Sequence, residues 1–235
     1  MPGSGRAAVN AYSAADPTPR RLALIANGYT PVPVCAPGCQ HIGKRGPCLS
    51  PGKAVHLSGW ARGGFTAADV RTWPSRRVLD TNTGLLCGNL VAVDGDILDP
   101  ALAAEVEGLV ERHLGPTPLR RIGRAPKWLR CYRAEAPMRK METPELLMPD
   151  GTVAQVEVLG TGQQFVAYGV HPDTGQPYAW QGEAPDTTPL DRLPVVTPDA
   201  LRAFLDAATA LIVQAGGRKR EPTRAAPGEA PESRD

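Results

Sequence analysis

Leu90-Val91-Ala92-Val93-Asp94-Gly95-Asp96 is an apolar run that ends in two carboxylates one residue apart. In a β-strand, residues i and i+2 point to the same face, so we expect Asp94 and Asp96 to converge at the strand end. Two converging carboxylates can bind a divalent cation, and oxygen-only sites favour Mg²⁺ or Mn²⁺. Asp-Gly is also a favoured hairpin turn, so a simple turn is the alternative.

A third acid, Glu157, lies in a second apolar run, Val156-Glu157-Val158-Leu159. A carboxylate that faces a core is costly unless it has a partner. Two acids on one strand and a third on a neighbouring strand are typical of a metal-dependent nucleotidyl-transfer site. Asp94, Asp96 and Glu157 are therefore the predicted catalytic residues and the predicted ligands of two Mg²⁺ or Mn²⁺ ions.

A basic segment, residues 120–133, lies between the two acidic strands. Gly123 and Pro126 exclude a helix there and predict a strand, a turn and a second strand. Guanidinium groups bind phosphates and aromatic rings stack on bases, so the segment is suited to a nucleotide or to single-stranded nucleic acid. The alternative is a solvated basic edge strand. Together with a histidine that follows a later strand, the predicted nucleotide-binding residues are Arg121, Arg124, Lys127, Arg130 and His171, the last with a structural histidine in a turn as the alternative.

The stretch that contains Cys35, Cys39, His41 and Cys48 offers four soft ligands in a short loop, with His56 as a spare. Tetrahedral Zn²⁺ accepts three thiolates and one imidazole, and it would order a loop too polar to fold alone. Free, reduced thiols are the alternative. Five cysteines, an odd number, argue against a disulfide framework.

The chain of 235 residues has a formal net charge of +2, so any affinity for nucleic acid must come from a local basic patch. Its longest apolar runs are too short to cross a bilayer, and residues 1–6 lack the apolar core of a signal peptide. We therefore expect a cytoplasmic protein with no membrane partner.

Caps and apolar periodicity predict an α+β fold in which helices alternate with paired strands. The helices are expected to start at Asp16-Pro17, to cover 67–73 and end before Pro74, to start at Asp99-Pro100, and to cover 198–214. The expected strands are 29–34, 83–87 and 90–94 as adjacent strands, 119–122, 128–132, 153–159 and 164–168. The predicted division is a flexible N-terminus (1–15), a catalytic domain (16–188), a C-terminal helical segment (189–215) and a disordered tail (216–235).

From about Ala23 to Trp180 the order of these motifs resembles the prim-pol branch of the archaeo-eukaryotic primase superfamily, the bifunctional DNA primase/polymerase N-terminal domain. The stretches that carry the resemblance are Gly28-Tyr29, Pro51-Gly52-Lys53, Gly59-Trp60, Thr66 to Trp73, Val93 to Asp96, Val156 to Val158 and Gly162 to Trp180. The second motif departs from the family pattern: many members have a histidine there, whereas this chain has Gly123-Arg124-Ala125-Pro126-Lys127.

The resemblance implies an RRM-like antiparallel sheet flanked by helices, and a DNA primase/polymerase that uses dNTPs or NTPs on a single-stranded DNA template. It further implies replication of a plasmid, phage or integrated element, with unwinding by a separately encoded helicase. The alternative function is a non-catalytic replication module that binds nucleotide or single-stranded DNA and recruits a helicase. A different nucleotidyltransferase, such as an end-processing repair polymerase, is the third possibility.

Overall fold

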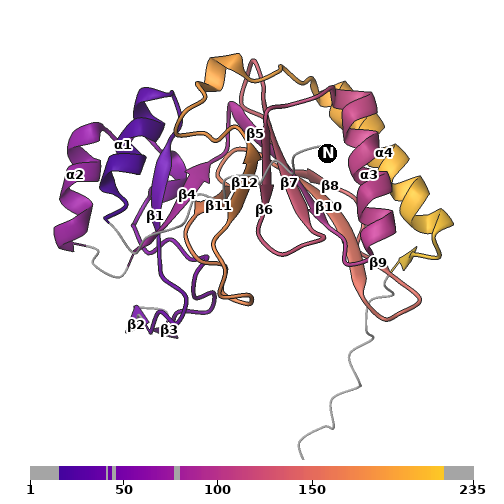
Figure 1. Cartoon of the computed structure of the whole chain (residues 1–235), viewed down its shortest axis with the longest axis horizontal. Helices are drawn as coiled ribbons and strands as arrows, with labels where there is room; N and C mark the ends of the chain where they lie inside the picture. The colour runs from indigo at the N-terminus through magenta and orange to yellow at the C-terminus, as the bar shows by residue number, and fades with distance from the viewer. Residues whose placement is uncertain (1–15, 41, 44–45, 77–79, 220–235) are drawn as a thin grey trace, which may run out of the picture.

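The computed structural model describes residues 16–40, 42–43, 46–76 and 80–219 (Figure 1). A main sheet has the strand order β12-β6-β7-β5-β10-β9-β13, with β8 also paired to β10, and a smaller sheet has the order β1-β4-β11. The main-sheet strands are β5 (Leu90–Asp96), β6 (Leu119–Ile122), β7 (Trp128–Arg133), β8 (Met141–Glu142), β9 (Leu146–Leu147), β10 (Val153–Leu159), β12 (Ala179–Gly182) and β13 (Arg218–Lys219). The smaller sheet contains β1 (Pro31–Val34), β4 (Asn82–Leu86) and β11 (Gln164–Tyr168), and a two-stranded ribbon is formed by β2 (Ile42–Gly43) and β3 (Gly46–Pro47).

Four α-helices in the described part of the chain flank these sheets, and every pairing between the named strands is antiparallel. The fold is therefore of the expected α+β class. The helices are α1 (Thr18–Ala26), α2 (Ala67–Arg76), α3 (Pro100–Leu114) and α4 (Pro198–Gln214). In Figure 1, α1 and α2 lie beside the smaller sheet, whereas α3 and α4 pack together over the main sheet.

The larger hydrophobic core lies between the main sheet and the pair α3 and α4. Both helices begin at a side-chain cap: Asp99 accepts a hydrogen bond from the backbone N–H of Leu102 at 2.7 Å, and Thr197 accepts one from Ala200 at 3.2 Å. The core side chains include Val91, Val93, Val106, Val110, Trp128, Phe204 and Ile212. The apolar side of each helix is buried against the main sheet, and this packing determines which face of the sheet is excluded from solvent.

The strand β5 has two faces with different roles. Its odd-numbered residues Val91 and Val93 belong to the core under α3 and α4. Its even-numbered residues point to the opposite face, where Ala92 packs with apolar residues of the smaller sheet and of β7. Asp94 and Asp96 continue this second face past its apolar part, so alternation along the strand carries both carboxylates to the space between the two sheets.

Gly95 is part of β5 and not of a turn, which excludes the hairpin-turn alternative for Asp94-Gly95-Asp96. It pairs with Trp128 of the neighbouring strand β7. A Cβ at this position would lie 2.4 Å from the Trp128 ring atom Cε2, so the indole occupies the space that a side chain would need. The glycine between the two acids is therefore explained by close packing on the helix-covered face.

Most expected elements are present with bounds close to those predicted, α4 and β6 among them. Three expectations about elements were wrong. The strands β4 and β5 are not adjacent, because β4 has both edges occupied by β1 and β11 and so belongs to the other sheet. The helix α2 continues past Pro74 to Arg76. Arg218 and Lys219 form β13 against β9, although the sequence predicts disorder from residue 216.

The predicted flexible N-terminus and the last sixteen residues of the chain, 220–235, lie outside the described part. No helix among the described residues is both long and apolar enough to cross a bilayer.

We predict that Gly95→Ala lowers the free energy of unfolding by about 1–3 kcal/mol, because the added methyl group overpacks the core against Trp128. Chemical denaturation of the purified protein measures this change. Gly88→Ala is the matched control, since a Cβ there meets nothing within 4 Å and the residue has no positive φ. Equal stabilities of the two variants would contradict the close-packing explanation.

Candidate active site

Three carboxylates share one face of the main sheet. The strands β5 and β10 pair in a register that sets Glu157 directly opposite Asp94 and Gln155 opposite Asp96. Residues directly opposite in an antiparallel pair have Cβ atoms about 5 Å apart on the same face. The three acids predicted from the sequence are therefore neighbours, two from a central strand and one from the next strand.

Two lysines neutralise the outer members of this group. Lys127, from the turn between β6 and β7, pairs with Asp96, and Lys140, just before β8, pairs with Glu157. Burial raises the pKa of Asp94 to about 6, the nearby Arg121 opposes that rise, and the charges of Asp96 and Glu157 add to it. Asp94 is thus the acid whose ionised form most needs a further cation.

The donor set fits a divalent cation, because three carboxylates are ligands that Mg²⁺ and Mn²⁺ prefer. Burial is the main cause of the raised pKa of Asp94, and the charges of Asp96 and Glu157 add to it, so a bound cation would favour the ionised form of this acid. Lys127 and Lys140 hold the other two carboxylates, so a cation would share or replace these ion pairs. Asp94, Asp96 and Glu157 are the residues that would hold the metal.

The acids form one wall of a cavity of about 370 Å³ between the two sheets. Its remaining walls come from both halves of the molecule: the turn after β6, the strand β11, the segment that follows β11, and Lys53 from the loop after β3. Four of the five residues predicted to bind nucleotide line this cavity, namely Arg121, Arg124, Lys127 and His171.

Arg121 is a buried cation at the base of the cavity, with 7 % of its surface exposed. One terminal nitrogen of its guanidinium donates a hydrogen bond to the carbonyl oxygen of Val166. The guanidinium carbon lies 4.7 Å from the ring centroid of Tyr178, within the range of a cation–π contact. Its Nε has no hydrogen-bond partner among the described residues. Arg121 therefore keeps donor capacity and a positive charge next to Asp94.

His171 lies against the turn that replaces the second family motif. A Cβ at Gly123 would be 3.1 Å from the imidazole Cδ2, and the Tyr178 ring contacts the imidazole with 5.2 Å between centroids and a tilt of 51°. The backbone N–H of Asp173 donates to Nδ1 at 3.2 Å, which leaves the proton of the neutral ring on Nε2. Burial lowers the pKa of His171, and the positive charges of Lys53, Arg121 and Arg124 lower it further. At neutral pH this histidine is therefore an uncharged hydrogen-bond donor.

Arg130 is not part of the cavity, in contrast to the sequence-based expectation. It shares a strand face with Trp128 and Tyr132 as expected, but that face packs against α3. Its guanidinium binds Glu107 and Glu111 of α3, each at 2.8 Å. The expected stacking surface is therefore closed, because the two aromatic rings belong to the core.

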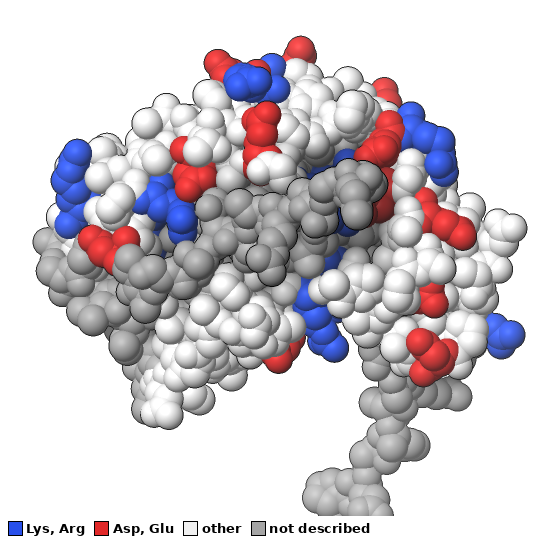
Figure 2. All heavy atoms as spheres, viewed as in Figure 1, with Lys and Arg blue, Asp and Glu red and all other residues white. Residues whose placement is uncertain are grey.

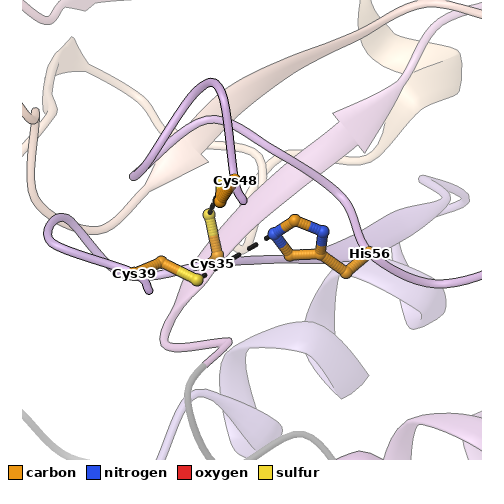
Figure 3. A group of neighbouring side chains, drawn as sticks. All are labelled: Cys35, Cys39, Cys48 and His56. Atoms are coloured by element: carbon orange, nitrogen blue, oxygen red, sulfur yellow. Dashed lines mark hydrogen bonds between the residues drawn. The ribbon is translucent and has the colours of Figure 1, made fainter. Parts of the chain in front are cut away.

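A second group of ligating side chains lies in the loop that the sequence marks as a metal site (Figure 3). Cys35, Cys39, Cys48 and His56 point toward one another, and their ligand atoms all lie within 4.8 Å of one another. The Sγ atoms of Cys35 and Cys48 are 4.0 Å apart, and Sγ of Cys39 is 3.9 Å from Nε2 of His56. Zn–S bonds of 2.3 Å in a tetrahedron place ligand atoms about 3.8 Å apart, so the group has the dimensions of a zinc site.

The histidine of this group is His56, which the sequence offers only as a spare, and His41 lies outside the described residues. Within the described part of the chain this is the one group of three or more ligating side chains whose ligand atoms gather so closely. The three acids share a face but are less tightly gathered.

Two lysines of the site were not predicted as site residues. Lys53 belongs to the Pro51-Gly52-Lys53 stretch that supports the family resemblance, so a signal for it existed. Lys140 has no such signal, because it stands between the basic segment and β8. On the face shown in Figure 2, acidic and basic side chains are interspersed, in keeping with the nearly neutral chain.

A face-sharing acidic triad beside a basic cavity, on an antiparallel sheet, is the arrangement expected of a nucleotidyltransferase. The family model for the N-terminal domain of bifunctional DNA primase/polymerases, Prim-Pol, matches residues 21–196. The chain belongs to this family, which supports a primase/polymerase type of function with DNA and nucleotides as substrates. A comparison with curated proteins gives no match.

We predict that Arg130→Ala lowers the free energy of unfolding by about 2 kcal/mol and leaves nucleotide affinity unchanged, because it removes a largely buried partner of Glu107. Denaturant unfolding and nucleotide titration measure the two effects. Arg202→Ala is the control: it removes an exposed ion pair with Asp199 and should change stability by less than about 0.5 kcal/mol. Weakened nucleotide binding at unchanged stability would show that Arg130 is a nucleotide-binding residue after all.

Proposed function

We propose that this protein is a DNA primase/polymerase that performs template-directed nucleotidyl transfer from (d)NTPs, with Asp94, Asp96 and Glu157 as the ligands of two Mg²⁺ or Mn²⁺ ions. The observation that carries the proposal is the register of β5 and β10, which sets Glu157 directly opposite Asp94 next to a basic cavity. A protein that only binds nucleic acid has no need for three carboxylates at this position, since they repel phosphates.

The cations, when bound, supply charge stabilisation at the α-phosphate and lower the pKa of the attacking 3′-hydroxyl group. Asp94 and Asp96 would hold them from β5 and Glu157 from β10, and each of these strands has neighbouring strands on both sides that fix its backbone. A carboxylate held in this way does not need to reorganise when charge develops in the transition state.

The basic side chains of the cavity bind the triphosphate. Arg121 provides a permanent charge close to Asp94, and Arg124 is half exposed at the cavity rim, 3.8 Å from Asp173. Lys127 is placed to exchange Asp96 for a phosphate oxygen, because it pairs with Asp96 and both residues line the cavity. His171 has its Nδ1 occupied by the backbone N–H of Asp173, so its Nε2–H would donate a hydrogen bond to a phosphate oxygen. Together these groups replace the histidine that many family members carry in the second motif.

A structural Zn²⁺ ion is a further proposed cofactor, held by Cys35, Cys39, Cys48 and His56. The distances of about 4 Å between their ligand atoms support it. The surrounding loop buries little apolar surface, and Leu49 within it is 89 % exposed. A metal that closes this loop would supply stability that its side chains do not.

A helicase that opens the template, and replication of a plasmid, phage or integrated element, complete the proposed setting. Both rest on the family resemblance. The second candidate function, a replication module that binds without catalysis, is an outcome of the experiment below.

We predict that Asp94→Ala and Asp96→Ala reduce nucleotide incorporation at least about 1,000-fold, because loss of a metal ligand removes several kcal/mol of transition-state stabilisation. The assay measures incorporation on primed and unprimed single-stranded DNA with Mg²⁺ or Mn²⁺, and unprimed templates report priming. Asp199→Ala, an exposed acid on α4, is the matched control.

Wild-type synthesis with an active Asp94→Ala variant would overturn the assignment of the acids. Wild-type protein that binds single-stranded DNA or nucleotide but yields no product with either metal would favour the replication module. Products that need no template would favour an end-processing transferase.

We predict that protein purified without added metal contains about one zinc per chain, and that Cys48→Ser loses it, because a structural site needs all four ligands. Elemental analysis measures the content. The buried Cys87 belongs to the core of β5 and β11, so Cys87→Ser is the control that retains zinc. A metal-free wild-type protein would exclude the site.

A further inference from the structure

Lys53 is a cation in the catalytic cavity that comes from the cysteine-containing loop and not from the sheet. It lines the same cavity as Asp94 and His171, and its charge acts on His171. Its side chain is exposed, and among the described residues no carboxylate forms an ion pair with its ammonium group. Lys127 and Arg124 in the same cavity each have an acidic partner, so Lys53 differs from them in being available to an added anion.

The backbone around Lys53 is fastened to the walls of the cavity. The side-chain amide of Gln164, on β11, donates a hydrogen bond to the carbonyl oxygen of Lys53 at 3.0 Å. The buried amide of Asn82, on β4, donates to the carbonyl oxygen of Gly52 at 3.0 Å. Gly52 has φ +81°, and a Cβ there would lie 3.1 Å from Pro172, the residue after His171. Three separate contacts therefore set where this short stretch meets the cavity.

The same stretch is fastened on its other side to the Cys/His group. Lys53 follows Cys48 by five residues and precedes His56 by three, so a metal bound by both would close a short loop around it. The backbone N–H of Gly52 donates to the carbonyl oxygen of Ala36 at 3.0 Å, and that of Cys35 donates to Ala54 at 3.0 Å. The segment that carries Lys53 is thus bonded directly to the segment that carries Cys35 and Cys39.

We propose that Lys53 binds the phosphates of the incoming nucleotide and that the metal at Cys35, Cys39, Cys48 and His56 holds Lys53 in place for this role. Metal occupancy and nucleotide affinity are then linked, although the metal lies outside the catalytic cavity. The ligand class, a nucleoside triphosphate, rests on the proposed function. The linkage itself rests on the loop contacts described above.

The test is an equilibrium titration of the metal-loaded protein with a deoxynucleoside triphosphate and Mg²⁺, without template, so that binding is measured apart from catalysis. Lys53→Ala should weaken affinity about tenfold, because it removes a charge-assisted contact to phosphate. Lys53→Arg should retain most of the affinity. Lys219→Ala, an exposed lysine on β13 outside the cavity, is the matched control and should bind as the wild type does.

The role of the metal is tested by a double-mutant cycle. Cys39→Ser should lose zinc and weaken nucleotide binding by about the same factor as Lys53→Ala. The double variant should bind no more weakly than either single variant, because both substitutions remove the same contact between Lys53 and phosphate. Circular dichroism and the unfolding midpoint establish that Cys39→Ser is folded, and chelation of zinc from the wild type gives the same measurement without a substitution.

Unchanged affinity in Lys53→Ala would overturn the role of Lys53 while leaving the polymerase assignment intact if the wild type still synthesises DNA. Additive losses in the double variant would overturn the linkage and leave Lys53 as an independent ligand. A wild type that binds triphosphate but makes no product would refute the proposed catalysis, and the cycle would still decide the proposal about Lys53. A wild type that binds no triphosphate would overturn both proposals.

Discussion

The register between β5 and β10 is the constraint on which the site depends. It sets Glu157 opposite Asp94, and a slip by one residue would send Glu157 to the face that α3 and α4 cover. The register is strongly specified, because Val156 and Val158 alternate with Glu157 and must enter that core. Burial of two valines thus decides the position of one acid, and the same packing explains why only glycine fits between Asp94 and Asp96.

Much of the main sheet could be predicted from the sequence because its signals are local. Caps at Asp99 and Thr197 mark the starts of α3 and α4. Successive side chains of a strand point to opposite faces, which places Asp94 and Asp96 of β5 on one face. The pairing of β4 could not be predicted, since strand order depends on contacts between distant segments. The family resemblance is confirmed over residues 21–196.

The sequence did not predict which face of a strand is covered by a helix. Periodicity shows that Arg130 shares a face with Trp128, but it does not show that α3 lies on that face and offers Glu107. The same limit applies to the cysteine loop. Spacing along the chain favours His41 as the nearest imidazole, whereas the turn through Gly52 brings His56 to the three thiols. Spacing along the chain predicts that three cysteines and a histidine gather, but it does not predict which histidine is the fourth member.

The residues that line the cavity come from two kinds of structure, paired strands and connecting segments. Its acids are on strands that are hydrogen-bonded on both sides, whereas Lys53 and His171 are on connecting segments. Connecting segments tolerate sequence change far better than paired strands, because little core packing depends on them. Under the proposed function, changes in these connecting segments would therefore alter which nucleotide or template is accepted, while the three acids on the paired strands stay where they are.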